Sequence, residues 1–148
     1  MNIRSVFRNN LPYFAFLSGV ALIDQIVKHR VEKHPEEFAQ VVHNTGFAGE
    51  KLKNRPDIVR KTAFALTALG IARLPFMADD SRSDRIMKTG WAMIMGGALS
   101  NTYDRVIRKY VVDYIPKGKY VYNLGDFAIY SGLSVTIAGA VLDRKGKE

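Results

Sequence analysis

The apolar residues of this chain are gathered into four blocks, which charged and polar segments separate. The blocks cover 9–27, 58–78, 86–103 and 127–142. A helix that crosses a bilayer needs about 20 mostly apolar residues, so each block approaches that length. The pattern predicts a mainly α-helical membrane protein with four transmembrane helices. The length of 148 residues favours a single domain over residues 1–148.

The first block resembles a secretory signal peptide, because a basic segment precedes the apolar run 11–23. Cleavage by a signal peptidase needs small residues after such a run. Asp24 and Lys28 follow it instead. We therefore expect a helix that the protein retains.

A soluble helical bundle is the alternative, since no block holds about 18 apolar residues without interruption. The positions of three carboxylates favour the membrane. Asp24, Asp104 and Asp126 lie inside or at the ends of apolar blocks. A carboxylate in lipid is costly and usually serves a function. Lysine and arginine flank the blocks on both sides, so charge bias alone does not fix the orientation.

The third block is rich in small residues, which let helices approach closely in lipid. They are Gly90, Gly96, Gly97 and Ala98. We expect this helix to pack closely against its neighbours.

Two loops carry the pattern of short strands. Residues 39–44 are rich in β-formers and lead into a turn over 45–49. Residues 110–115 and 120–122 are also rich in β-formers, with a turn expected over 116–119. With four spans, these two loops lie on the same side of the membrane, where together they can form a site.

Composition narrows the chemistry. The chain has no cysteine, which removes disulfides, zinc–thiolate sites and a cysteine nucleophile. Its three histidines lack the spacing of a metal site, so we expect no metal. The net charge of +8 leaves open a soluble basic domain that binds nucleic acid. Because the basic residues are spread over every loop, we expect no nucleic-acid partner.

Two carboxylates could carry catalysis. Asp113 lies in a β-like segment, and Asp126 lies at the start of the fourth block. Two carboxyl groups that share a proton can act as base toward water and as acid toward a carbonyl, which is peptide hydrolysis without a metal. The simpler alternatives are a helix-start acid for Asp126 and an exposed strand residue paired with a cation for Asp113.

A second polar group closes the third block. Asn101 and Arg105 are four residues apart, so they share a helix face and could bind a peptide backbone. The simpler interpretation is an ion pair between Asp104 and Arg105 at the helix end. The segment Asn44-Thr-Gly46 could likewise be only a turn.

Five motifs in order closely resemble those of signal peptidase II, the lipoprotein signal peptidase of bacteria. They are Asp24-Gln-Ile-Val-Lys28, Asn44-Thr-Gly46, the segment 96–105 (GGALSNTYDR), Val111-Val-Asp113-Tyr-Ile115 and Tyr122-Asn123-Leu-Gly-Asp126. Any one of them is weak evidence. Five at compatible spacing, from the first block to the fourth, are specific.

The resemblance implies a four-helix aspartyl protease of the bacterial cytoplasmic membrane, with both termini in the cytoplasm. It implies a small extracytoplasmic β-cradle, with the active site near the extracytoplasmic face. Such enzymes cut prolipoproteins before the diacylglyceryl-modified cysteine and need no cofactor. By motif, Asp113 and Asp126 are the catalytic pair, and Asn44, Asn101, Arg105 and Asn123 line the substrate site. The resemblance further implies that Asp24 and Lys28 support the first helix and its surroundings, and that Asp104 steadies the polar cluster. The expected partners are prolipoproteins and membrane lipids, and we expect a monomer.

The chain departs from the family pattern at three places. Phe47 and the residues after it differ from the usual sequence after Asn-Thr-Gly, Ser100 replaces a glycine, and Gly125 replaces an alanine. Gly125 is expected to add backbone freedom beside a catalytic acid. These departures leave open a non-catalytic membrane paralogue that binds lipidated or signal-peptide segments.

Overall fold

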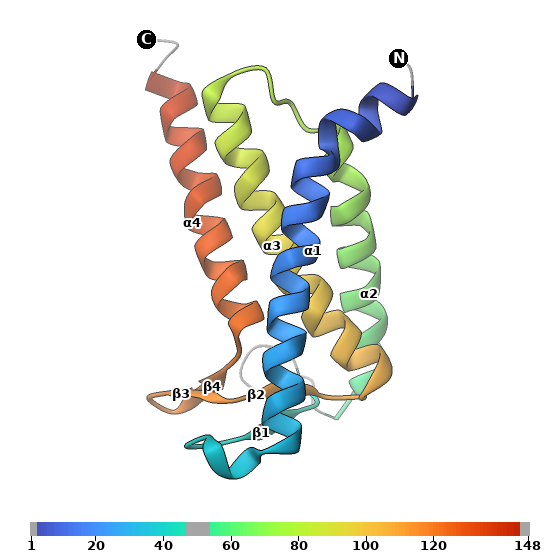
Figure 1. Ribbon diagram of the computed structural model, residues 1–148, viewed down its shortest axis with the longest axis vertical. Coiled ribbons are helices and arrows are strands. Elements are labelled where there is room, and N and C mark those ends of the chain that lie inside the picture. Colours follow the sequence, from blue (N-terminus) through green and yellow to red (C-terminus); the bar gives the residue numbers. More distant parts are fainter. Residues whose placement is uncertain (1–2, 47–53, 146–148) are drawn as a thin grey trace.

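Four long helices run alternately up and down through the molecule (Figure 1). The structure is a computed structural model that describes residues 3–46 and 54–145. The helices are α1 (Ile3–Lys33), α2 (Pro56–Arg73), α3 (Arg82–Ile107) and α4 (Leu124–Lys145). Two short 3-10 helices, η1 (Pro35–Glu37) and η2 (Leu74–Phe76), follow α1 and α2. Each of the four apolar blocks therefore forms a helix.

Helix α1 is longer than the apolar block predicts, because it begins at Ile3 and continues through the charged residues to Lys33. Packing explains the extension at its end: Val31 is fully buried in a cluster with Val112 and Tyr114. Pro12 lies inside the helix. The first turns bend away from the rest of α1 near this point (Figure 1), as expected where proline removes a backbone hydrogen bond.

Helices α3 and α4 approach each other through glycines. A Cβ atom on Gly90 would lie 2.6 Å from the carbonyl oxygen of Gly132, and one on Gly97 would overlap the carbonyl oxygen of Gly125. Gly96 faces α1 instead, where a Cβ would lie 2.8 Å from Leu17 O. The predicted close packing of the third block is confirmed. It brings the backbone of α4 to within contact distance of α3.

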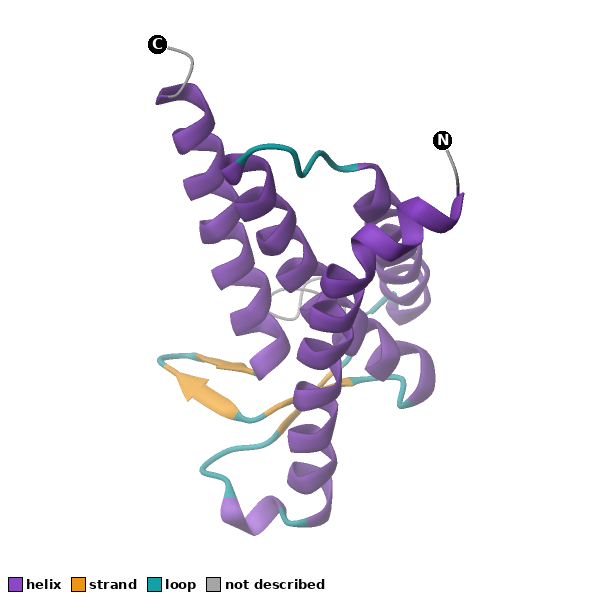
Figure 2. Ribbon diagram, turned by 45° about the horizontal axis from the view of Figure 1, so that its top comes forward, coloured by secondary structure: helices purple, strands orange, loops and turns teal. Residues whose placement is uncertain are grey.

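Two small antiparallel sheets lie at one end of the helices (Figure 2). Strand β1 (Val42–Asn44) pairs with β2 (Val111–Asp113), so that Val42 is opposite Asp113. Strand β3 (Ile115–Lys117) pairs with β4 (Tyr120–Tyr122). Strands thus form in each predicted segment, but the segment 110–115 is divided at Tyr114 between the two sheets, and the turn is shorter than 116–119.

The turn between β3 and β4 consists of Gly118 and Lys119, while Pro116 pairs with Val121 inside the sheet. Proline is tolerated there because each strand has only one partner. Gly118 has φ of +62°, which glycine adopts without steric cost. The reversal therefore occurs at the glycine and not at the proline.

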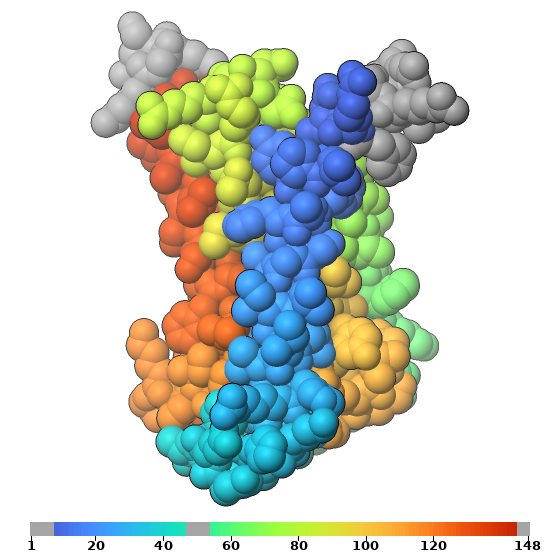
Figure 3. Space-filling view, viewed as in Figure 1, coloured from blue at the N-terminus to red at the C-terminus, as the bar shows by residue number. Residues whose placement is uncertain are grey.

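The helices leave much apolar surface outside. Among the described helices, two are long and apolar enough to cross a membrane, over Arg8–Lys33 and Leu124–Arg144. Figure 3 shows α1 as a ridge across one face, with α4 and α2 on either side. Outward-facing apolar side chains occur on α2 as well: Phe64, Leu66 and Leu69 are each at least 60% exposed.

Candidate active site

The first turn of α4 is closed by a reciprocal cap. The backbone N–H of Asp126 donates to Asn123 Oδ1 at 2.9 Å, and the backbone N–H of Asn123 donates to Asp126 Oδ2 at 3.3 Å. A capping residue and an acid three positions later satisfy two free helix donors in this way. Asp126 is therefore the helix-start acid of the simpler interpretation. The same cap fixes the direction of its carboxylate.

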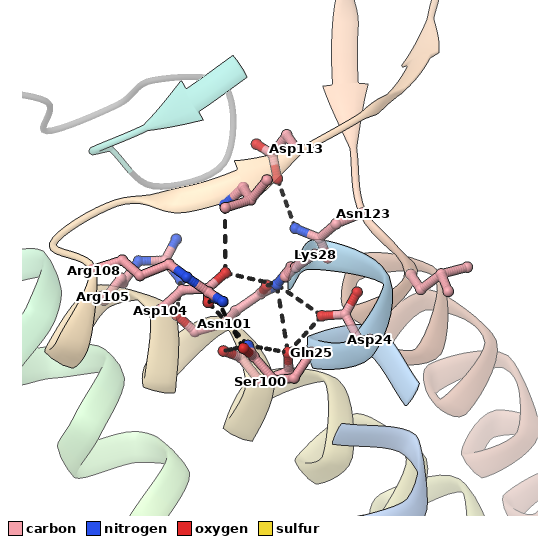
Figure 4. Close-up of polar contacts among 12 residues, drawn as sticks. Asp24, Gln25, Lys28, Ser100, Asn101, Asp104, Arg105, Arg108, Asp113 and Asn123 are labelled. Atoms are coloured by element: carbon pink, nitrogen blue, oxygen red, sulfur yellow. Dashed lines mark hydrogen bonds and ion pairs between the residues drawn. The ribbon is translucent and has the colours of Figure 1, made fainter. Parts of the chain in front are cut away.

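Asn123 also reaches the other candidate carboxylate. Its side-chain amide donates to Asp113 Oδ1 at 2.6 Å (Figure 4). Asn44 Nδ2 donates to Asp113 Oδ2 at 3.2 Å. Asp113 is 4% exposed, and Asn123 is fully buried. The alternative for Asp113, an exposed strand residue paired with a cation, is wrong. Strand pairing and the start of α4 bring the carboxylates of Asp113 and Asp126 to the same residue, Asn123.

The environment of Asp113 favours its protonated form. Burial raises the pKa of Asp113 to about 6, and the negative charge of Asp126 acts in the same direction. The hydrogen bonds from Asn123 and Asn44, and the positive charge of Lys28, oppose this rise. A carboxyl group with a pKa in this range can hold or release a proton near neutral pH.

Asn101 and Arg105 extend the site along α3. Asn101 Nδ2 donates to Asp126 Oδ1 at 2.9 Å. The guanidinium of Arg105 donates to the carbonyl oxygens of Asn101 and Gly46, each at 3.2 Å. Its Nε is buried and has no hydrogen-bond partner among the described residues. Asn44 Oδ1 accepts from the N–H of Gly46 at 2.9 Å, so Asn44-Thr-Gly46 is indeed a turn, and it carries a side chain of the site.

A buried charged cluster lies behind Asn101. Lys28 Nζ is 2.7 Å from Asp24 Oδ2 and 2.9 Å from Asp104 Oδ2, and all three side chains are at most 1% exposed. Arg108 pairs with the other oxygen of Asp104. The predicted ion pair between Asp104 and Arg105 is therefore replaced by pairs with Lys28 and Arg108. Two acids and two bases make the cluster neutral.

Several members of this cluster were not predicted from the sequence. Gln25 Nε2 donates to Asp104 Oδ1 and to Ser100 Oγ, each at 2.9 Å. Tyr114 Oη lies 3.5 Å from Asp24 Oδ1 and accepts from the N–H of Leu124 at 3.3 Å. Only Arg108 has a local signal, because it lies four residues after Asp104 on the same helix.

Two of the three departures from the family pattern have a visible structural setting. Ser100 Oγ donates to Asp24 Oδ2 at 2.5 Å, so the serine joins the charged cluster. Gly125 is helical without a positive φ, and a Cβ there would lie 2.9 Å from Asp24 Oδ2. The expectation of backbone freedom is thus corrected, because Gly125 serves close packing. Phe47 lies outside the described residues.

Within residues 3–46 and 54–145, histidine, aspartate and glutamate form no group of three or more that could hold a metal ion. The polar groups that converge on Asp113 and Asp126 are side-chain amides, a backbone N–H and a guanidinium. This set can hold two carboxyl groups in unlike hydrogen-bonding environments and orient a peptide beside them.

Comparisons with known proteins agree with this arrangement. The model of the family described as signal peptidase (SPase) II matches residues 16–142. The lipoprotein signal peptidase of Aquifex aeolicus is 30% identical over 138 residues, covering 84% of this chain and 83% of that protein. That of Caldicellulosiruptor bescii is 29% identical over 149 residues, covering 93% and 95%.

Two solved structures of bacterial membrane enzymes share the fold. One has a TM-score of 0.74 at 21% identity and covers 93% of this chain and 92% of that one. The other has a TM-score of 0.64 at 19% identity, covering 87% and 92%. With the family match over most of its length, the chain belongs to the signal peptidase II family and is a membrane peptidase.

Proposed function

We propose that this protein is an aspartyl endopeptidase that removes the signal peptide of prolipoproteins before their diacylglyceryl-modified cysteine, with Asp113 and Asp126 as the catalytic pair. Family membership supports the reaction class. The assignment of the pair rests on two contacts of Asn123. Its side-chain amide donates to Asp113, and its backbone N–H donates to Asp126.

The charges around the pair favour a single shared proton. The cluster of Asp24, Lys28, Asp104 and Arg108 is neutral. Outside that cluster, Arg105 is a cation whose charge interacts with both Asp113 and Asp126. One proton on the pair leaves one negative charge, which Arg105 balances. Two negative charges in this buried place would carry a large desolvation cost.

With that proton on Asp113, the ionised Asp126 is the base. It accepts a proton from a water molecule, whose oxygen attacks the scissile carbonyl carbon. Asp113 donates its proton to the carbonyl oxygen, which gives a tetrahedral diol. Return of a proton to the leaving nitrogen then breaks the C–N bond. Burial raises the pKa of Asp113 to about 6, which supports its role as the acid.

The remaining side chains hold the substrate and the pair in position. Asn44 and Asn123 keep Asp113 in place through their amide donors. Arg105 Nε has no hydrogen-bond partner within residues 3–46 and 54–145, and as a donor it is suited to a peptide carbonyl oxygen. Asn101 fixes Asp126 from the side of α3. These contacts supply orientation, and the two carboxyl groups carry the protons.

We further propose that all four helices cross the bacterial cytoplasmic membrane, with residues 1–148 as a single domain that acts as a monomer. Large apolar side chains on every helix support this, because they point away from the protein interior: Leu22 and Ile26 on α1, Leu66 and Leu69 on α2, Ile107 on α3, Leu133 and Ile137 on α4. The strands would then lie near the extracytoplasmic face, and the ends of the chain in the cytoplasm (Figure 1).

The test is cleavage of a prolipoprotein by the purified protein in detergent. Wild-type protein should release a product whose N-terminus is the diacylglyceryl cysteine, detected by mass spectrometry. Asp113→Asn and Asp126→Asn should each lose at least about 100-fold in rate. Asp80→Asn, an exposed acid between α2 and α3, is the matched control and should cleave like the wild type.

Normal cleavage by either active-site variant would overturn the catalytic pair. If the folded wild type binds the lipidated substrate and never cleaves it, the protein is a non-catalytic binding paralogue. If cleavage does not depend on the diacylglyceryl group, the substrate assignment is wrong although the peptidase chemistry stands.

A further inference from the structure

Lys28 lies behind the catalytic pair with every one of its donors in use. Its ammonium contacts Asp24 Oδ2 at 2.7 Å, Asp104 Oδ2 at 2.9 Å and Asn101 Oδ1 at 2.7 Å. The side chain is fully buried. Three N–H groups therefore point at three fixed oxygens (Figure 4). The contact with Asn101 is the one that leads toward Asp126.

The chemistry of an amide makes this contact directional. An ammonium group only donates, so Asn101 must turn its oxygen toward Lys28. Its NH₂ group then faces the other way and donates to Asp126 Oδ1 at 2.9 Å. A flipped amide would place an oxygen against the carboxylate and leave Lys28 facing an NH₂ group. Lys28 thus decides which end of Asn101 meets Asp126.

We propose that Lys28 is a positioning residue for catalysis: it orients the Asn101 amide so that Asp126 is held ionised as the base, and its buried positive charge tunes the proton of the pair. This inference rests on the proposed function. It goes further by giving a fully buried residue outside the catalytic pair a defined effect on rate and on pH dependence.

Among the described residues, the other charged groups around the pair do not replace Lys28. Asp24, on α1, carries a negative charge. On α3, Asp104 is also negative and pairs with Arg108, while Arg105 donates two of its N–H groups to backbone carbonyl oxygens. The β-strand segment contributes Asp113 and the neutral Tyr114, whose pKa is raised by burial. Lys28 is therefore the cation that acts through Asn101, and its charge lowers the pKa of Asp113.

The cluster can be expected to fold without this lysine. Asp104 keeps Arg108 and Gln25, and Asp24 keeps the hydroxyl groups of Ser100 and Tyr114. A second variant, Lys28→Met with Asp24→Asn, keeps the cluster neutral because it removes one charge of each sign. Comparison of the single and the double variant therefore separates a loss of folding from a loss of catalysis.

The experiment measures kcat and KM for prolipoprotein cleavage between pH 5 and 9, with wild-type cleavage as the reference that establishes the proposed function. For Lys28→Met we expect kcat to fall about tenfold or more at nearly unchanged KM. We also expect the pH–rate profile to move up by ~0.5–1 unit, because a cation near the pair is lost. Lys28→Met/Asp24→Asn should show the same fall in kcat.

Lys88→Met is the matched control. Lys88 is also buried, but it lies on α3 and pairs with Asp79 at 3.0 Å. Helix α3 begins at the end of the helices opposite the strands (Figure 1). It should lower thermal stability without moving the pH profile. The inference is overturned if the folded Lys28 variants keep the wild-type profile and kcat, or if their loss is entirely in KM. Should Lys28→Met not fold, the kcat of the double variant decides alone.

Discussion

The side-chain NH₂ group of Asn123 donates a hydrogen bond to Asp113 at 2.6 Å. The carbonyl oxygen of the same side chain accepts from the backbone N–H of Asp126 and so caps the first turn of α4. One fully buried side chain thus couples the end of a strand to the start of a helix. Any movement of α4 relative to β2 changes the separation of the two carboxyl groups. The geometry of the pair depends on this residue as much as on the acids themselves.

Replacement of Asn123 should separate its two roles. Asn123→Ala removes both, so we expect about 1 kcal/mol lower stability and a loss of kcat of about 100-fold. Asn123→Ser keeps a capping oxygen but cannot reach Asp113. It should regain most of the stability, measured by thermal unfolding in detergent, and little of the activity. Recovery of activity by the serine variant would refute the coupling.

The pH dependence should follow the proton on Asp113. Its pKa is raised to about 6, so below that pH the acid is present and above it the acid is lost. We therefore expect kcat/KM to decline as pH rises beyond about 6. Size-exclusion profiles recorded at each pH distinguish titration of the active site from unfolding of the protein. A flat profile from pH 5 to 8 in folded protein would contradict the assignment.

The glycines between α3 and α4 should tolerate no added methyl group. Gly97→Ala places a Cβ against the carbonyl of Gly125, so we expect a loss of about 1–3 kcal/mol from overpacking. Gly19→Ala in α1 is the control, because no atom lies within 4 Å of the added Cβ. It should be neutral or stabilising by up to about 1 kcal/mol. Equal thermal shifts for the two variants would show that close approach is unimportant.

The end of α3 contains one strained residue. Lys109 has φ of +74°, and its N–H donates to Asp104 O at 3.0 Å to close the helix. A left-handed conformation costs a non-glycine residue about 1–2 kcal/mol, so Lys109→Gly should raise stability by about 1 kcal/mol. Lys109→Ala keeps the strain and serves as the comparison in thermal unfolding. The prediction fails if alanine stabilises as much as glycine.

The membrane arrangement can be tested with single cysteines, because the chain has none of its own. Lys119→Cys marks the turn between β3 and β4, and Asp80→Cys marks the connection between α2 and α3. A membrane-impermeant maleimide should label the first in intact spheroplasts and the second only after permeabilisation. Labelling of both from outside would exclude four spans with this orientation.

The sequence alone determined the local architecture. Apolar blocks bounded by charges become helices wherever the chain can bury or embed one face, and β-formers beside a turn become short strands. That is why the four helices, the strands at 42–44, 111–113 and 120–122, and the close packing at Gly90 and Gly97 could be predicted. The ordered motifs added the catalytic assignment, which cleavage by the Asp113 and Asp126 variants will test.

Only the tertiary structure decided which side chains meet. Lys28 and Asp104 are 76 positions apart, and their contact depends on the rotation of α1 against α3. Gly125 was expected to loosen the backbone and instead lets α4 approach Asp24. The physical reason is that local pattern fixes which residues share a face of one helix. The rotation and approach of one helix against another are set by packing among residues far apart in the chain.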